Sequence, residues 1–189
     1  MTIKKTARKT WNFLWNSDSP SSWFVDLIIA FVLVRFVIFP LLGLLLATSL
    51  PLVVIESGSM HHDAANFNDW WLTNSGWYEN EDISKEEFSN WRFKNGLDKG
   101  DIIITKGKDS YEIGDIIIFT TNVQKTPIIH RIVLYNDTLQ HFETKGDNNP
   151  TQLPYEKLVR NGQIVGSAWI RIPKIGWIKL AIVELIRGL

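Results

Sequence analysis

Residues 27–55 form a long apolar run that contains a single charged residue, Arg35. The part from 36 to 55 alone supplies the roughly 20 uncharged residues that a helix needs to cross the hydrocarbon core of a bilayer. A charge at the bilayer centre costs several kcal/mol, so we expect the long Arg35 side chain to extend toward the membrane surface. The sequence therefore predicts a transmembrane anchor over residues 23–55, with Pro40 and Gly43 as tolerated kink points.

The distribution of basic residues predicts the orientation of this anchor. Four of them precede it (Lys4, Lys5, Arg8 and Lys9), and none occurs between Arg35 and Lys85. Basic residues flanking a span favour the cytoplasm. We therefore expect a single-pass protein of the cell membrane, with residues 1–22 as a basic cytoplasmic arm and the chain beyond Pro51 outside. A disordered tail is the alternative for the arm, and a cleaved signal peptide for the span, although its apolar region is normally shorter.

Composition excludes several classes of function. Twenty basic residues balance twenty acidic ones, which argues against a nucleic-acid partner. The chain has no cysteine, so disulfides, thiolate metal sites and cysteine nucleophiles are excluded. Its four histidines do not follow a metal-binding spacing, and no glycine-rich phosphate loop is present. We expect neither a metal nor a cofactor.

Short β-branched runs introduced by turn residues predict a mainly β domain over residues 56–174, built as a sandwich or partly open barrel. The predicted strands are 102–105, 116–119, 128–134, 139–144 and 164–172. Residues 175–189 place Ile175, Ile178, Ile182 and Leu185 on one helical face. This segment is too short to span a bilayer, and we expect a short amphipathic helix lying on the membrane, with docking on the domain as the alternative.

Residues 61–97 differ in character from the strands on either side. They are expected to be polar loops with interspersed aromatic side chains, forming an insertion in the β-domain. One short helix is predicted where Ser84 and Glu87 have the spacing of a capping box. The aromatic side chains could enter the lipid headgroup region or pack the insertion against the domain, and the sequence leaves both open.

A candidate nucleophile, Ser59, follows shortly after the apolar run. A serine hydroxyl needs a base to accept its proton, and histidine suits this role because its pKa lies near neutrality. A carboxylate on the second ring nitrogen would hold the correct tautomer. His130 on a strand and Asp147 on a loop could supply these groups if the two segments are neighbours. A strand histidine is more often structural, so these residues alone do not decide the matter.

Four local motifs occur in a recognisable order: Ser57-Gly58-Ser59-Met60, Gly114-Asp115-Ile116-Ile117, His130-Arg131-Ile132 and Lys145-Gly146-Asp147-Asn148-Asn149. Together they resemble type I signal peptidases, specifically the archaeal and endoplasmic-reticulum branch that uses histidine where bacterial enzymes use lysine. Residues 164–176 are similar to the closing strand of that family. The resemblance covers roughly residues 23–177, apart from the 61–97 insertion.

The resemblance implies a role for each matching residue. Ser59 matches the nucleophile and His130 the general base, while Ser57 matches the residue that helps the Ser59 backbone N–H to stabilise the oxyanion. Met60 completes this motif and is assigned to the same oxyanion and substrate-binding group. Asp147 matches the acidic residue that orients the base, with a turn-forming role as its alternative.

One position departs from the family pattern. Many relatives carry a second aspartate six residues after the first, but here that position is Leu153, and Glu156 is the nearest later acid. Either Asp147 alone orients His130, or another residue fills the third role.

The resemblance implies a membrane-anchored serine endopeptidase that removes signal peptides from exported precursors through an acyl-enzyme. Its expected partners are these precursors and the lipid bilayer, and its oligomeric state is left open. An exposed strand edge near Ser59 could bind the extended cleavage site as an added strand. Two alternatives are a non-catalytic membrane-anchored β-domain that serves as a binding or assembly subunit, and a self-cleaving serine protease of the same fold.

Overall fold

The computed structural model describes residues 6, 8, 11–13, 15–17 and 19–187. The chain divides into two compact units, Met1–Leu45 and Leu46–Leu189, and each is considered by itself. Ten of the 22 residues of the predicted basic arm, including Lys4, Lys5 and Lys9, lie outside the described residues.

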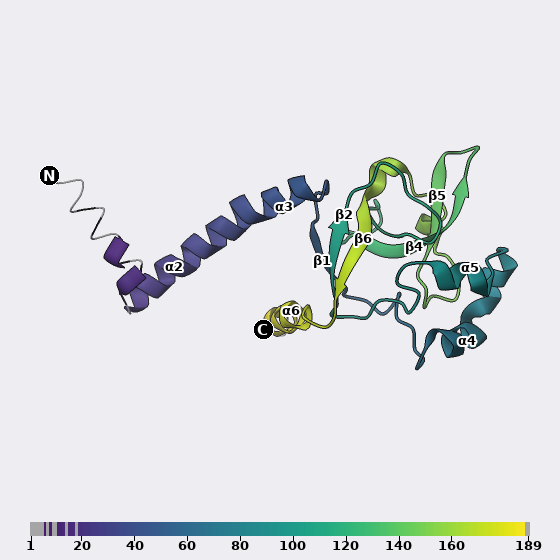
Figure 1. Cartoon of the computed structure of the whole chain (residues 1–189), viewed down its shortest axis with the longest axis horizontal. Coiled ribbons are helices and arrows are strands. Elements are labelled where there is room, and N and C mark those ends of the chain that lie inside the picture. Colours follow the sequence, from purple (N-terminus) through teal and green to yellow (C-terminus); the bar gives the residue numbers. More distant parts are fainter. Residues whose placement is uncertain (1–5, 7, 9–10, 14, 18, 188–189) are drawn as a thin grey trace. The chain divides into compact units, whose positions relative to one another are not determined.

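The first unit is dominated by one apolar helix, Pro20–Leu45, which is 26 residues long. It consists of α2 (Pro20–Leu33), a π-helical turn η1 (Val34–Ile38) and α3 (Phe39–Leu45) (Figure 1). Ser19 caps its start by accepting a hydrogen bond from the Ser22 N–H. The π-turn ends two residues before Pro40, whose missing N–H interrupts the α-helical hydrogen-bond ladder. At 1.5 Å per residue the helix is about 39 Å long, enough to cross a membrane by length and composition.

The predicted extent of the apolar helix was wrong at its C-terminal end. The helix stops at Leu45, not at Ile55, and Leu52–Val54 forms strand β1, which pairs with β2 in the second unit. The apolar character of a segment alone does not distinguish a membrane helix from a buried strand, because both consist of the same apolar residues. Arg35 consequently lies near the middle of the helix, where its guanidinium group faces the Phe36 ring.

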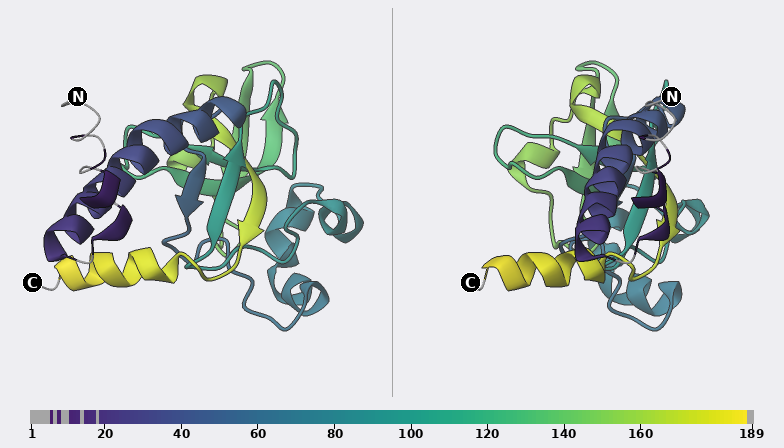
Figure 2. Two further views of the ribbon diagram at one scale, coloured as in Figure 1. Left: turned by 60° about the vertical axis from the view of Figure 1, so that its left-hand side comes forward. Right: turned by 90° about the vertical axis from the view of Figure 1, so that its left-hand side faces the viewer.

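The second unit is built on one curled antiparallel sheet of six strands in the order β1-β2-β6-β3-β4-β5 (Figures 1 and 2). This confirms the mainly β fold class and the five predicted strands. The strands are β1 (Leu52–Val54), β2 (Ile102–Lys106), β3 (Ile116–Phe119), β4 (Ile128–Asn136), β5 (His141–Lys145) and β6 (Ile164–Ile172). All four residues of β3 are buried, as expected for an isoleucine-rich strand between two neighbours.

The insertion contains two helices, α4 (Phe67–Asn80) and α5 (Lys85–Asn90). The predicted short helix α5 is confirmed, and Ser84 accepts its capping hydrogen bond from the Glu87 N–H. The prediction of polar loops was wrong over α4. Its aromatic residues recur at helical spacing and form a buried cluster with α5 and β4: Phe67, Trp70, Trp71, Tyr78, Ile83, Phe88 and Val133. Of the two alternatives for the aromatic side chains, the structure supports packing.

The C-terminal helix predicted from the sequence is present as α6 (Trp177–Arg187). Leu180 is buried, whereas Ile178, Ile182 and Leu185 are each more than half exposed. Lys179 pairs with Glu56 at 2.9 Å, three residues before Ser59. The helix therefore exposes an apolar face, and an ion pair joins it to the segment that bears the candidate nucleophile.

Candidate active site

Ser59 and His130 lie within hydrogen-bonding distance, with 2.9 Å between Ser59 Oγ and His130 Nε2. Ser59 lies in a turn that follows β1, in which the His61 N–H donates to the Gly58 carbonyl at 3.0 Å. His130 lies on β4, paired with Ile117 of β3, and is buried. The sheet thus holds the imidazole rigidly while the turn presents the hydroxyl to it, and Nε2 is placed to accept the Ser59 proton.

The second ring nitrogen of His130, Nδ1, is hydrogen-bonded to the carboxylate of Glu156. Glu156 is fully buried and lies in the short 3-10 helix η2 (Pro154–Glu156). Its other oxygen accepts the Leu153 N–H at 2.5 Å, so the residue at the family's second acidic position helps to orient the glutamate. Ser59, His130 and Glu156 form a continuous hydrogen-bonded chain, the arrangement of a serine–histidine–acid triad. The one available sequence signal was that Glu156 is the first acid after Asp147.

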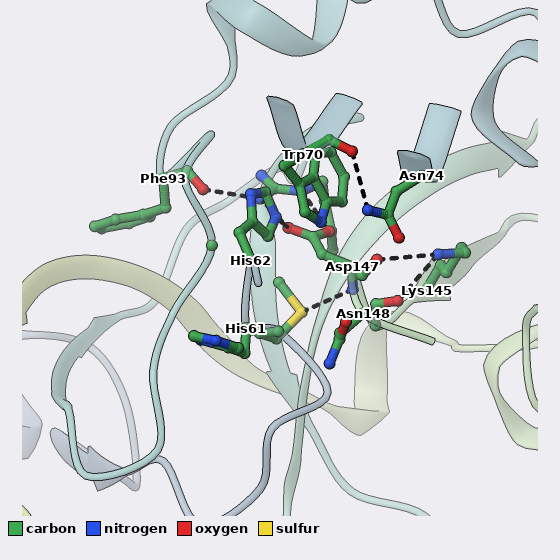
Figure 3. A network of polar contacts seen from close by, with 12 residues as sticks. His61, His62, Trp70, Asn74, Phe93, Lys145, Asp147 and Asn148 are labelled. Carbon is green, nitrogen blue, oxygen red and sulfur yellow. Dashed lines mark hydrogen bonds and ion pairs between the residues drawn. The ribbon is translucent and has the colours of Figure 1, made fainter. Parts of the chain in front are cut away.

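Asp147 does not take the place next to His130 that was expected of it. It binds Arg131, whose Nε and terminal nitrogen donate to its two oxygens at 3.0 and 2.6 Å. His62 Nε2 lies 3.0 Å from one of the same oxygens (Figure 3). Neighbouring residues of a strand point to opposite faces, so a carboxylate bound to Arg131 cannot also serve His130.

The electrostatic surroundings of Asp147 favour its ionised form. Burial by itself would raise the pKa of this carboxyl group, but Arg131 and His62 outweigh burial and hold the pKa well below its usual range. Tyr78 donates its hydroxyl proton to Asp147 at 3.2 Å, and burial together with this carboxylate raises the pKa of Tyr78. Asp147 is therefore a stable anion that joins three donors.

The loop that carries Asp147 also sets the position of Ser59. The Asn148 N–H donates to the Ser59 carbonyl at 2.8 Å, and the Asn148 side chain donates to the Gly58 carbonyl at 3.1 Å. Gly146 is required at the closest approach, because a Cβ there would lie 2.8 Å from His130 Nε2 and 2.9 Å from the Ser59 carbonyl oxygen. The small residue allows the loop to pass directly beneath the dyad.

The remaining two predicted site residues differ in exposure. Ser57 is exposed, and its Oγ lies 3.1 Å from Ser59 Oγ. Met60 is only 1% exposed, and its sulfur accepts the Asp147 N–H at 3.4 Å. Its side chain therefore packs beneath the loop, and its expected oxyanion and substrate-binding role stays a prediction. Among the residues that the structure describes, no group of three or more histidine, aspartate or glutamate side chains could hold a metal ion.

Lys145 is a buried cation at the start of the same loop. Its Nζ donates to the Gly146 and Asp147 carbonyls at 3.1 and 3.4 Å and faces the rings of Trp77 and Tyr78 (Figure 3). Burial lowers the pKa of Lys145 from 10.5 to about 8, against the opposing attraction of the nearby Asp147 and Glu156 carboxylates. The folded protein therefore prefers this lysine neutral more strongly than the unfolded chain does.

This preference predicts a pH dependence of stability. Between pH 8 and 10.5 the unfolded chain binds more protons at Lys145, so the free energy of unfolding should rise with pH over this window. The rise, measured relative to Lys145→Met, should reach about 3 kcal/mol. Below pH 8 Lys145 is charged in both states, and its burial should destabilise the folded protein by this full amount. Denaturant unfolding in detergent, followed by tryptophan fluorescence, measures it. A difference between the two proteins that does not change with pH would contradict the prediction.

The chain resembles curated proteins, although no family model matches it. It is 31% identical over 100 residues to a signal peptidase complex catalytic subunit of Komagataella phaffii, covering 46% of this chain and 58% of that protein. The corresponding subunit of Scheffersomyces stipitis is 26% identical over 158 residues, 79% of this chain and 75% of that protein. That of Lodderomyces elongisporus is 32% identical over 95 residues, 57% of its length.

The first of these matches thus extends over less than two thirds of its relative, and the second over three quarters. All carry the same description, and the structure has the mainly β fold that the motifs implied. The resemblance to type I signal peptidases of the endoplasmic-reticulum branch is therefore confirmed, and the chain is a homologue of signal peptidase catalytic subunits.

Proposed function

We propose that this chain is a membrane-anchored serine endopeptidase that removes N-terminal signal peptides from exported precursors. The observation that carries the proposal is the hydrogen-bonded chain from Ser59 through His130 to Glu156. A non-catalytic binding subunit would have no need for a buried imidazole held between a hydroxyl and a carboxylate.

The proposed reaction has two steps. His130 Nε2 accepts the Ser59 proton as Oγ attacks the carbonyl carbon of the scissile peptide bond, while Nδ1–H donates to Glu156, which stabilises the imidazolium. The imidazolium then gives its proton to the leaving amine, and the peptide bond breaks to form an acyl-enzyme on Ser59. A water molecule, deprotonated by His130, hydrolyses this ester and restores the serine.

Ser57 is proposed to contribute to the oxyanion site together with the backbone N–H of Ser59. Its hydroxyl lies beside the nucleophile and is exposed, so it can turn toward the substrate oxygen. Ser57→Ala should lower kcat by about 10²–10³-fold, equivalent to about 2.7–4 kcal/mol, with little change in KM. Steady-state cleavage of a precursor measures both constants, and an unaltered kcat would remove Ser57 from the oxyanion site.

The architecture offers a route for the substrate to reach Ser59. β1 lies at one edge of the sheet and leads within five residues to the nucleophile. An extended cleavage site could add to such an edge through main-chain hydrogen bonds. We propose that the apolar helix Pro20–Leu45 anchors the chain with its N-terminus in the cytoplasm, and that the exposed apolar face of α6 rests on the outer bilayer surface.

The direct test is cleavage of a precursor by the purified full-length chain in detergent or liposomes. We expect a single cut at the end of the signal peptide, identified by the mass of the mature product. Products that arise only from within this chain would instead favour self-cleavage. Intact precursor combined with specific precursor binding would favour the assembly-subunit alternative.

A further inference from the structure

Among the contacts between the insertion and the candidate active site, those to Asp147 are made by side chains, whereas Arg131 donates to the backbone carbonyls of Arg92 and Phe93. Two side chains of the insertion contact the Asp147 carboxylate: His62 Nε2 at 3.0 Å from Oδ2, and the Tyr78 hydroxyl at 3.2 Å from Oδ1. Figure 3 shows His62 lying beside Trp70 and the Asp147 carboxylate. His62 and Tyr78 therefore join the insertion to the loop 146–148, which contacts Ser59.

His62 is held in a single orientation by the aromatic cluster. Its ring stacks on Trp70 with 3.7 Å between centroids and 2° between planes. A Cβ at Gly96 would lie 2.5 Å from Cδ2 of the His62 ring, so the backbone at Gly96 also packs closely against the imidazole. A side chain fixed in this way delivers its N–H to Asp147 without a further loss of rotamer freedom.

Because Asp147 is held by His62, the backbone N–H groups of Asp147 and Asn148 are also held in place, and both contact the segment that carries Ser59. The Asp147 N–H donates to Met60, and the Asn148 N–H donates to the Ser59 carbonyl. His62 lies only three residues after Ser59, so the contact closes a short loop between the nucleophile segment and the 146–148 loop. The side-chain and main-chain contacts therefore act on the same pair of segments.

From this geometry we infer that His62 and Tyr78 are positioning residues of the insertion, which hold Ser59 in line with His130 by clamping the Asp147 loop. The inference deepens the proposed function and rests on it for its catalytic consequence. It assigns the insertion a part in building the active site, in addition to packing against Val133 of β4.

The first test does not depend on activity. His62→Phe keeps a ring for stacking on Trp70 and removes the donor to Asp147, whereas His62→Gln keeps a donor. Hydrogen exchange of the full-length chain in detergent should show the Asn148 amide of His62→Phe exchanging about tenfold faster, with the β3 amides unchanged. His62→Gln should restore protection. Equal protection of Asn148 in all three proteins would overturn the clamp.

The second test measures catalysis. His62→Phe should lower kcat for precursor cleavage by about 10–100-fold with KM within about twofold, because a small displacement of Ser59 from His130 affects the chemical step most. His62→Gln should recover most of kcat, and Tyr78→Phe, which removes only a hydroxyl, should show a smaller loss in the same direction. His141→Phe is the matched control, since it replaces another buried histidine, on β5.

The outcomes separate the two proposals. If His141→Phe loses as much kcat as His62→Phe at equal loss of thermal stability, His62 is structural only and the inference is wrong. If His62→Phe folds and retains full kcat, the inference is also wrong. If the wild-type chain cleaves no precursor, the proposed function fails, and the exchange measurement still decides whether His62 and Asp147 clamp the loop.

Discussion

Ser59→Ala and His130→Ala should each abolish precursor cleavage by the purified chain while leaving it folded and associated with the membrane. The expected loss of kcat is about 10⁶-fold, the size found when the nucleophile or the base is removed from a serine–histidine triad. The physical reason is that the hydroxyl and the imidazole, 2.9 Å apart, act as one unit. Without its base the serine stays protonated, and without the serine no acyl-enzyme forms.

The double variant Ser59→Ala/His130→Ala provides a sharper form of this experiment. Because the two groups serve one step, the double variant should be no slower than either single variant, whereas independent contributions would multiply. Single-turnover cleavage with enzyme in excess measures all three, and precursor binding should remain near the wild-type value. Substantial cleavage by either single variant would refute the assignment of the dyad.

Glu156→Gln should lower kcat by about 10⁴-fold with KM nearly unchanged, the size of loss seen when a triad carboxylate becomes an amide. Glutamine keeps the shape of the side chain but cannot supply the negative charge that stabilises the imidazolium. An amide in this position can also favour the wrong tautomer of His130. Steady-state kinetics on the folded variant provide the measurement, and circular dichroism provides the control for folding.

Asp147→Asn is the matched comparison, because it makes the same chemical change at the acid that the sequence favoured. Its main effect should be on stability, since the buried Arg131 loses its counter-charge, a change that typically costs about 3–5 kcal/mol. Its kcat should fall much less than that of Glu156→Gln. A larger loss of kcat in Asp147→Asn than in Glu156→Gln would return the orienting role to Asp147.

Local patterns in the sequence were sufficient for most of the fold. The isoleucine runs predicted β2, β3 and β4 because β-branched residues suit a buried pleated surface, and the turn residues before the apolar run predicted a helix beginning near Trp23, three residues after its observed start. Helix α4 was missed because asparagine, serine, threonine and glycine weaken its intrinsic helix preference. The spacing of Phe67, Trp70, Trp71 and Tyr78 was the signal that could have identified it.

The sequence by itself determined the fold class from local strand patterns, and the candidate nucleophile and base from the order of four short motifs that resemble a known family. Only the tertiary structure decided which acid serves His130, where the apolar helix gives way to β1, and what Asp147 binds. These outcomes depend on contacts between distant segments, 71 residues apart for Ser59 and His130 and 26 for His130 and Glu156. Such contacts depend on how the whole domain packs, so they cannot be predicted from the periodicity of a local stretch of sequence.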